Sequence, residues 1–225
     1  MKQLIWINSI TLIFLTAACT TDQESTQITE DNKVESANIL PYYADPTFQP
    51  HWIRNEESLA DFHQIRPFQL TDQDGNEFTE KDVEGKIYIV DFFFATCGGI
   101  CPKMTSNMAI LQDEFIDNPE VLLLSHSVTP SIDTVEALAA YGDRNGIDSK
   151  RWKLLTGDRS EIYDLGRNYY FVEESLGLEK SEDDFLHTEN FVLLDQNRRI
   201  RGIYNGINKT SVNYLIEDIN TLLTN

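Results

Sequence analysis

Two cysteines four positions apart are the residues of this chain best suited to chemistry. Cys97 and Cys101 enclose Gly98-Gly99-Ile100, and the only other cysteine is Cys19, near the N-terminus. Two thiols at this spacing can close as a disulfide, exchange with another disulfide, or chelate one soft metal ion. Three cysteines are too few for a four-cysteine zinc site or a cysteine-bound iron–sulfur cluster. The pair therefore indicates thiol redox chemistry, metal binding or a purely structural disulfide.

The segments on either side of the pair favour a reactive thiol. The apolar run Ile87–Phe94 predicts a strand buried on both faces of a largely parallel sheet. Apolar residues at helical spacing follow the pair, namely Met104, Met108, Leu111 and Phe115. At least one sulfur then lies near a helix N-terminus, where the helix dipole favours the thiolate. If the first helical turn is formed, the spacing of four places both cysteines on one helix face, and two glycines leave the backbone between them adaptable.

Other patterns predict the remaining elements of one α/β domain. Turn residues between short alternating runs indicate hairpins at 67–79 and 191–204, and an apolar run indicates a strand at 121–128. Capping residues followed three positions later by an acid start helices at Asp133-Thr134 and Asp158, and an amphipathic helix covers 212–223. Residues 39–66 are aromatic and interrupted by prolines, so we expect an irregular wrap over the domain. This order predicts a thioredoxin-like fold with an N-terminal β-hairpin extension.

The N-terminus has the features of an export signal. Lys2 precedes an apolar stretch, Leu4–Ala18, which is too short to span a bilayer comfortably. The stretch ends in Leu15-Thr16-Ala17-Ala18-Cys19, which resembles the lipobox of bacterial lipoproteins. We therefore expect a signal peptide at 1–18, a lipidated Cys19 with a flexible tether at 19–38, and the folded domain at 39–225. The domain would face the periplasm, anchored to a bacterial membrane; a plain secretory signal or an uncleaved anchor is the alternative.

The charge of the chain argues against one class of partner. Eighteen Lys and Arg residues stand against 37 Asp and Glu, which gives a formal net charge of -19. Such a surface repels a phosphate backbone, which argues against nucleic acid as a partner. The excess could attract cations or a basic protein, or could simply be a solvated surface.

A longer string of residues points to a known family. The motif 92–104, FFFATCGGICPKM, is followed much later by His187, just before the strand 191–195. Further landmarks are Leu40-Pro41-Tyr42-Tyr43, Gln73-Asp74-Gly75, Ser127-Val128-Thr129-Pro130 with Asp133-Thr134, and Leu155-Thr156-Gly157. Together these resemble the Sco/SenC family of copper proteins associated with cytochrome oxidase assembly. The resemblance covers residues 39–224.

The resemblance implies a copper site and a role. In that family the two motif cysteines and one distant histidine bind a single copper ion, which corresponds here to Cys97, Cys101 and His187. Two thiolates and an imidazole suit Cu(I) and also permit Cu(II). The implied function is a metallochaperone rather than an enzyme, with the copper-accepting subunit of a respiratory oxidase as partner. The chain departs from the family where Gly98 and Gly99 replace a frequent Pro and acidic residue, and where no Asp adjoins His187.

Other functions for the same residues remain open. Cys97 and Cys101 could be the catalytic redox pair of a thiol-disulfide oxidoreductase or a redox sensor. Such oxidoreductases carry a Pro before the strand at 191–194, whereas no Pro follows Pro130 here. A thiol peroxidase ranks lower, because no Pro precedes Cys97 in the run from Asp91.

Other histidines and methionines receive weaker assignments. We expect His126 to be a buried, hydrogen-bonded core residue, and Met104 and Met108 to be core residues rather than copper ligands. His51 and His63 receive no role.

Overall fold

The computed structural model describes residues 39–54, 56–172, 186 and 188–224. The chain divides into two units, 1–37 and 38–225, and the first lies outside the described residues. The predicted signal peptide, Cys19, the tether and His187 therefore all lie outside what the structure describes. None of the described helices is long and apolar enough to cross a membrane.

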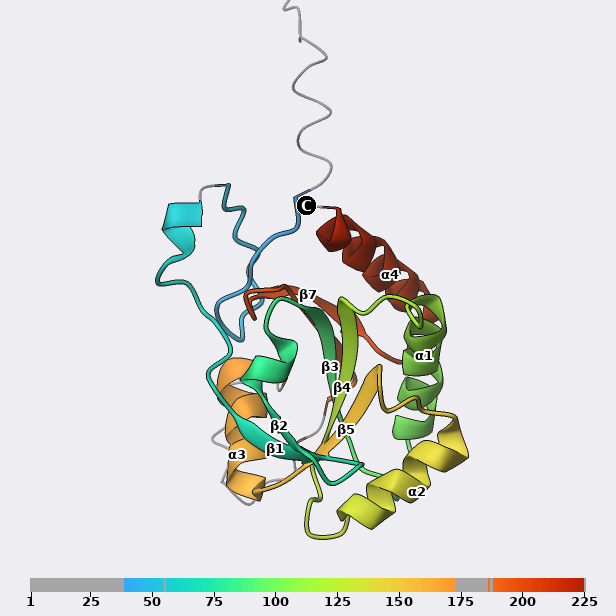
Figure 1. Cartoon of the computed structure of the whole chain (residues 1–225). Helices are drawn as coiled ribbons and strands as arrows, with labels where there is room; N and C mark the ends of the chain where they lie inside the picture. The colour runs from blue at the N-terminus through green and yellow to red at the C-terminus, as the bar shows by residue number, and fades with distance from the viewer. Residues whose placement is uncertain (1–38, 55, 173–185, 187, 225) are drawn as a thin grey trace, which may run out of the picture. The chain divides into compact units, whose positions relative to one another are not determined.

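A seven-stranded mixed sheet forms the centre of the described domain (Figure 1). Its strands are β1 (Gln69–Asp72), β2 (Glu77–Thr79), β3 (Ile87–Phe93), β4 (Val121–Ser127), β5 (Trp152–Thr156), β6 (Asn190–Leu194) and β7 (Ile200–Asn205). They are arranged in the order β2-β1-β5-β4-β3-β6-β7. Only the pairs β3–β4 and β4–β5 are parallel; the others are antiparallel. The expectation of a largely parallel sheet was wrong, because both hairpins add antiparallel strands to the parallel centre.

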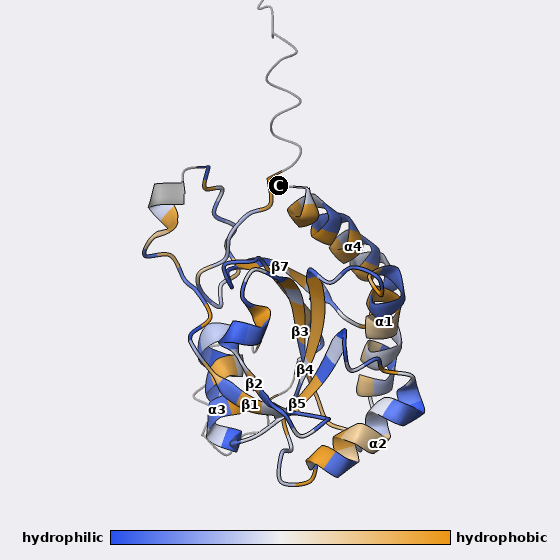
Figure 2. Cartoon of the chain, viewed as in Figure 1, coloured by the Kyte–Doolittle hydropathy of each residue, from blue (hydrophilic) through white to orange (hydrophobic). Residues whose placement is uncertain are grey.

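Helices cover both faces of this sheet. They are α1 (Cys101–Glu114), α2 (Val135–Asn145), α3 (Arg159–Asp164), which continues as the π-helix η4 (Leu165–Tyr169), and α4 (Lys209–Leu223), with 3-10 turns η2 (Glu56–Leu59) and η3 (Glu80–Val83). One core cluster joins the sheet to α1, α2 and α4, and a second joins the opposite face to α3 and η4. Figure 2 shows the apolar β3 and β4 between these layers. Every residue of β3 and β4 is buried, as their continuous apolar runs predict.

Strand β5 is the element that the sequence patterns did not reveal. Its sequence WKLLT is only five residues long and carries a lysine. It becomes a strand because it pairs with β4 on one side and β1 on the other. The Lys153 ammonium group lies 2.7 Å from the carboxylate of the buried Asp72 on β1. A short strand of this kind is stabilised by its neighbours rather than by its own propensity.

Side-chain caps begin two helices as expected. Thr134 accepts a hydrogen bond from the Ala137 N–H, and Asp158 accepts one from the Glu161 N–H. The cap of α2 is thus Thr134 rather than Asp133. The carboxylate of Asp133 instead accepts hydrogen bonds from the hydroxyls of Ser127 and Thr129.

The N-terminal segment wraps over the domain, as predicted for residues 39–66. It contains isolated bridges and the turn η2 but no strand or α-helix among its described residues. One bridge joins Tyr43 to Ile200 on β7, at the edge of the sheet. The guanidinium group of Arg201 donates to the carbonyls of Leu40 and Pro41 and lies 3.9 Å from the centre of the Tyr42 ring. Arg201 therefore attaches this segment to the sheet.

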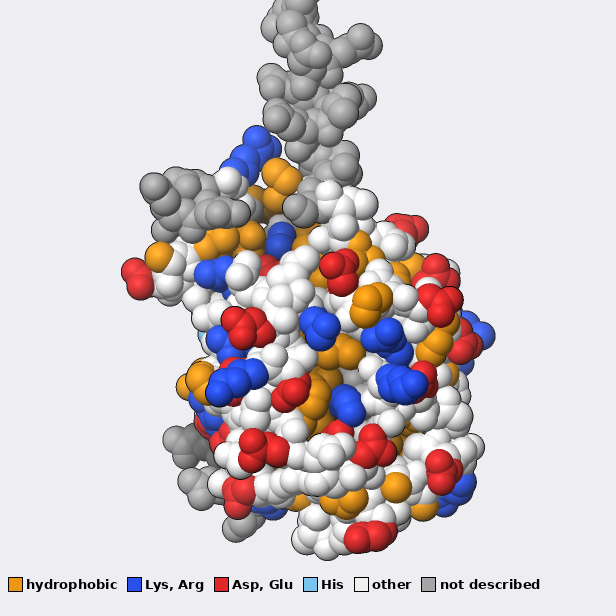
Figure 3. All heavy atoms as spheres, viewed as in Figure 1, with side chains coloured by type: hydrophobic (Ala, Val, Ile, Leu, Met, Phe, Trp, Pro, Cys, Tyr) orange, Lys and Arg blue, Asp and Glu red, His pale blue; other side chains and the backbone are white. Residues whose placement is uncertain are grey.

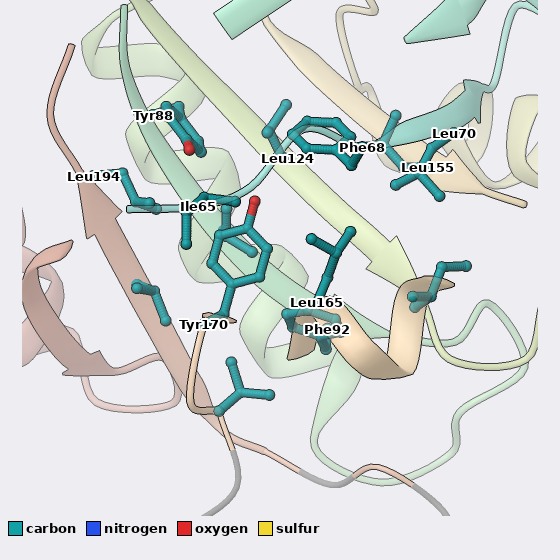
Figure 4. Packing of buried hydrophobic residues seen from close by; sticks show 14 of the residues in the cluster. Ile65, Phe68, Leu70, Tyr88, Phe92, Leu124, Leu155, Leu165, Tyr170 and Leu194 are labelled. Atoms are coloured by element: carbon teal, nitrogen blue, oxygen red, sulfur yellow. The ribbon is translucent and has the colours of Figure 1, made fainter. Parts of the chain in front are cut away.

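Figure 4 shows the core on the η4 side of the sheet, where residues from distant parts of the chain meet. Phe92 on β3 packs edge-to-face against Tyr170, with ring centroids 5.9 Å apart, and Leu165 belongs to the same cluster.

The surface in Figure 3 carries acidic and basic side chains side by side, so this face shows no continuous acidic patch.

Candidate functional site

The cysteine pair lies at the carboxyl ends of the parallel strands β3 and β4, with Cys97 in the loop after β3 and Cys101 as the first residue of α1. The N–H of Cys97 donates to the carbonyl of Phe94 at 3.2 Å, which forms a tight turn directly after β3. Helix α1 begins at Cys101, with Pro102 in its first turn. Cys97 therefore precedes the helix, so the helical turn that would have placed both cysteines on one face does not form. Both side chains are free thiols, with Cys97 partly exposed and Cys101 buried.

Two thiols this close have very different acidities. Burial alone would raise the pKa of Cys97, but hydrogen bonds from the Cys101 thiol and from backbone N–H groups outweigh it and lower that pKa. One of these donors is the N–H of Gly99, 3.3 Å from the Cys97 sulfur. Burial first, and then its hydrogen bond to Cys97, raise the pKa of Cys101 to about 12. The helix N-terminus thus favours the thiolate at Cys97, outside the helix, rather than at Cys101.

This asymmetry predicts the alkylation behaviour of the reduced, metal-free protein. Cys97 should react with iodoacetamide at a pH below the ordinary thiol range, while Cys101 should stay largely protected until the pH approaches about 12. Rates measured for each cysteine by mass spectrometry across pH would show this. Replacing Cys101 with Ala removes the thiol donor and should raise the pKa of Cys97, whereas Cys101→Ser keeps a donor and should largely preserve it. Equal pH profiles for both cysteines would contradict the assignment.

A buried carboxyl group lies on the same side of the sheet as the cysteine pair. Asp91 on β3 is 2% exposed, and its neighbour across the sheet is Ser125 on β4. Burial raises the pKa of Asp91 to about 7, although a hydrogen bond from Ser125 lowers it. The negative charge of Asp91 is one reason why the pKa of Cys101 is raised. The sequence patterns did not single out Asp91. A single acidic residue in an apolar strand does not show which residues its carboxyl group contacts in the folded protein.

Asp133 holds the loop that leads to Cys97. Its carboxylate accepts a hydrogen bond from the N–H of Ala95 at 3.2 Å, in addition to those from Ser127 and Thr129. Asp133 is fully buried, so these bonds are shielded from water. The ends of β3 and β4 are thereby joined beside the cysteine pair.

The remaining histidines and methionines lie largely where they were expected. Met104 and Met108 are fully buried in the core, which confirms their packing role. His126 is also fully buried and stacks on Phe92, and burial lowers its pKa to about 3. Its burial agrees with the prediction, and the backbone of Asp91 interacts with the ring, although no hydrogen bond of normal geometry reaches either ring nitrogen from the described residues.

His63 has a contact that the sequence did not suggest. Its Nε2 lies 2.8 Å from the carbonyl oxygen of Tyr169 at the end of η4. His51 is exposed and bridges to Tyr42 through its backbone.

The third predicted ligand, His187, lies outside the described residues, but its neighbours are described. Strand β6 pairs antiparallel with β3, with Val192 opposite Val90. Because the two strands run in opposite directions, the start of β6 lies toward the end of β3, after which the cysteine loop begins. No group of three His, Cys, Asp or Glu side chains within the described ranges could hold a metal ion.

The fold and the site together define a class of protein. A mixed sheet covered on both faces by helices, with a dithiol between its central strand and the following helix, is the architecture of a thioredoxin-like protein. The chain belongs to the SCO1/SenC family, whose model matches residues 56–224.

Curated relatives agree with this membership. The chain is 28% identical over 166 residues to the SCO1 protein homolog of Bacillus subtilis, covering 72% of this chain and 84% of the relative. It is 31% identical over 131 residues to the mitochondrial SCO1 homolog of Homo sapiens, covering 56% of this chain and 42% of that protein. The chain therefore spans less than half the length of this human relative.

Solved structures share the fold. A SCO1/SenC family lipoprotein from Bacillus anthracis is 33% identical, with a TM-score of 0.59 over 72% of this chain and 95% of that chain. BsSco, described as having a disulfide switch and as a member of the Sco family of cytochrome c oxidase assembly proteins, is 27% identical, with a TM-score of 0.58 over 72% and 94%. Arabidopsis thaliana ScoI, solved with copper bound, is 26% identical, with a TM-score of 0.53 over 69% and 97%.

Proposed function

We propose that this protein binds one copper ion through Cys97, Cys101 and His187 and delivers it to the copper centre of a respiratory cytochrome c oxidase. The observation that carries the proposal is the pair of free thiols in hydrogen-bond contact at the start of α1. Two sulfur donors suit a soft ion such as Cu(I), and an added imidazole would also accommodate Cu(II). Copper bound to a related protein, Arabidopsis ScoI, supports the same assignment here.

The acidities of the two thiols suit an ion that must be both held and released. Cys97 is partly exposed and favours the thiolate, so it would be the first ligand to engage copper. Cys101 is buried and favours the protonated thiol, so binding would displace its proton. Because Cys97 is the accessible ligand, we expect exchange with an acceptor protein to begin there. The copper-accepting subunit of the oxidase is the proposed partner.

The location proposed for the protein follows from its N-terminus. We propose cleavage after residue 18, lipidation of Cys19, and a tether at 19–38 that holds the domain 39–225 at a bacterial membrane, facing the periplasm. The Bacillus anthracis relative is described as a lipoprotein, which supports this reading.

A second function rests on a specific observation and uses the same cysteines. A thiol of lowered pKa beside a buried thiol of raised pKa is the arrangement of an attacking and a resolving cysteine in disulfide exchange. The disulfide switch described for BsSco is consistent with this alternative. The protein would then act as a thiol-disulfide oxidoreductase or a redox sensor without requiring His187.

Copper binding by the reduced full chain distinguishes these functions. We expect one tightly bound copper per chain in the wild type and marked loss of affinity in His187→Ala, with His51→Ala as a matched control that keeps wild-type affinity. The stoichiometry would be measured by metal analysis and the affinity by competition with a Cu(I) chelator. A reduced wild type that holds no copper would exclude the chaperone function and leave the thiol-redox function.

A further inference from the structure

The carboxylate of Asp133 connects two loops at the carboxyl ends of β3 and β4. Its Oδ2 atom accepts three hydrogen bonds, from the Ala95 N–H at 3.2 Å and from the hydroxyls of Ser127 at 2.6 Å and Thr129 at 2.9 Å. Ala95 follows β3, whereas Ser127 ends β4 and Thr129 follows it. A single carboxylate oxygen therefore joins the loop after β3 to the end of β4.

The Ala95 N–H belongs to the turn that carries the partly exposed thiol. The N–H of Cys97 donates to the carbonyl of Phe94 at 3.2 Å, which closes the turn with Ala95 inside it. The Cys97 sulfur is in turn in hydrogen-bond contact with the thiol of Cys101. The bond from Ala95 to Asp133 therefore holds the backbone two residues before the Cys97 sulfur.

The other end of this connection is held as well. Asp133 is fully buried, and its own N–H donates to the carbonyl of Thr129 at 2.9 Å. The next residue, Thr134, caps α2 by accepting a hydrogen bond from the Ala137 N–H. Asp133 thus lies in a closed turn between β4 and α2. Because water is excluded there, hydrogen bonds to its carboxylate are strong.

Helix capping does not account for an acid at this position, because the cap of α2 is Thr134. The second oxygen of Asp133, Oδ1, is buried without a hydrogen-bond partner among the described residues. Burying an unpaired oxygen is unfavourable, so the three bonds to Oδ2 must offset this loss. Of these three bonds, the one from Ala95 reaches the loop of the cysteine pair.

We propose that Asp133 is a positioning residue, which acts through the Ala95 N–H to hold the turn 94–97 where the Cys97 sulfur meets Cys101. Without this bond the turn samples other conformations, and the average distance between the two sulfurs increases. Ordering the turn in advance raises the effective concentration of one thiol at the other. This favours both disulfide closure and chelation of one ion. The effect on the disulfide needs only the two cysteines, whereas the effect on copper rests on the proposed function.

The first measurement is the equilibrium of the reduced full chain with glutathione disulfide. Two protein thiols are oxidised to one disulfide while one glutathione disulfide is reduced to two glutathione thiols, and mass spectrometry of the peptide that holds both cysteines gives the ratio. We expect Asp133→Ala to lower this equilibrium constant about tenfold, roughly the factor that ordering one residue contributes. The reduction potential then becomes about 30 mV less negative. Amide hydrogen exchange at Ala95 should also become faster.

Asp133→Asn is the conservative variant. Its carbonyl oxygen can still accept the Ala95 N–H, but a neutral acceptor bonds more weakly than a carboxylate, so we expect a loss of about threefold. If Asp133→Ala does not fold, this variant decides the question. A folded Asp133→Asn protein with the glutathione equilibrium of wild type would overturn the proposal.

Ser127→Ala and Thr129→Val are the matched controls. Each removes a hydroxyl that donates to the same oxygen but leaves the bond from Ala95 in place. Both variants should lower the free energy of unfolding while the glutathione equilibrium stays close to that of wild type. Controls that shift this equilibrium as far as Asp133→Ala would overturn the proposal, because any loss of stability would then separate the two thiols.

Copper binding separates this inference from the proposed function. Asp133→Ala should bind Cu(I) about tenfold more weakly than wild type in competition with a chelator. A shifted glutathione equilibrium in a protein whose wild type holds no copper would support the positioning role and exclude the chaperone function. Tight copper binding by the wild type, with an unshifted equilibrium in Asp133→Ala, would overturn the positioning role and leave the proposed function standing.

Discussion

Replacing Asp91 with Asn should change the stability of the protein in a strongly pH-dependent way. Asp91 is fully buried, and its pKa rises from 3.8 to about 7 on folding. The folded state therefore binds this proton more tightly than the unfolded state. The contribution of Asp91 to stability is greatest below pH 3.8 and falls as the pH rises to about 7. A shift of this size corresponds to about 4 kcal/mol in the free energy of unfolding.

The measurement is chemical denaturation of wild type and Asp91→Asn at pH 4 and pH 8. Asn cannot ionise, so the free energy of unfolding of the variant, measured relative to wild type, should be about 4 kcal/mol higher at pH 8 than at pH 4. This change with pH does not depend on how stable the variant is at pH 4. Asp72→Asn is a control of opposite sign. Burial raises the pKa of Asp72, but hydrogen bonds from Lys153 and Asn76 outweigh it and lower that pKa, so its contribution is lost as the pH falls. A stability difference for Asp91→Asn that is equal at both pH values would show that folding does not raise the pKa of Asp91.

Removing the guanidinium group of Arg201 should be the most damaging change at the edge of the sheet. Arg201 is 8% exposed and pairs with Asp195, which is 3% exposed, at 3.2 Å. Breaking a buried pair leaves an uncompensated charge, which typically costs about 3–5 kcal/mol. Asp195 still accepts hydrogen bonds from the N–H groups of Asn197 and Arg199, so we expect the lower end, about 3 kcal/mol, for Arg201→Met.

Arg199→Met is the matched control for this prediction. Arg199 donates from its side chain to the carbonyl of Leu59 but has no ion pair among the described residues. Its replacement should cost about 1 kcal/mol, the usual value of one hydrogen bond. Limited proteolysis should also cut the segment around Leu40 and Pro41 faster in Arg201→Met, because both carbonyls lose their donor. Equal destabilisation by both variants would mean that the buried pair contributes no more than a single hydrogen bond.

Local sequence patterns were sufficient to predict those elements whose structure depends mainly on their own residues. The continuous apolar runs of β3 and β4, the cap at Asp158 and both hairpins were confirmed, whereas the cap of α2 lies one residue later than the pattern indicated. Strand β5 was missed, because it owes its conformation to β4 and β1, which are distant in sequence. The number of parallel strand pairs was overestimated for a similar reason. The sequence of one strand does not show which strands pair with it or in which direction they run.

The sequence by itself determined the two cysteines, their place between a buried strand and a helix, and the family to which the chain belongs. It could not determine which thiol is the acidic one, because that depends on burial of Cys101 and on the N–H groups that face Cys97. Only the tertiary structure brought Asp133 to Ala95 and Leu186 to Gly166. These pairs are separated by long stretches of chain, and their contacts arise from packing of the whole domain rather than from any local pattern of residues.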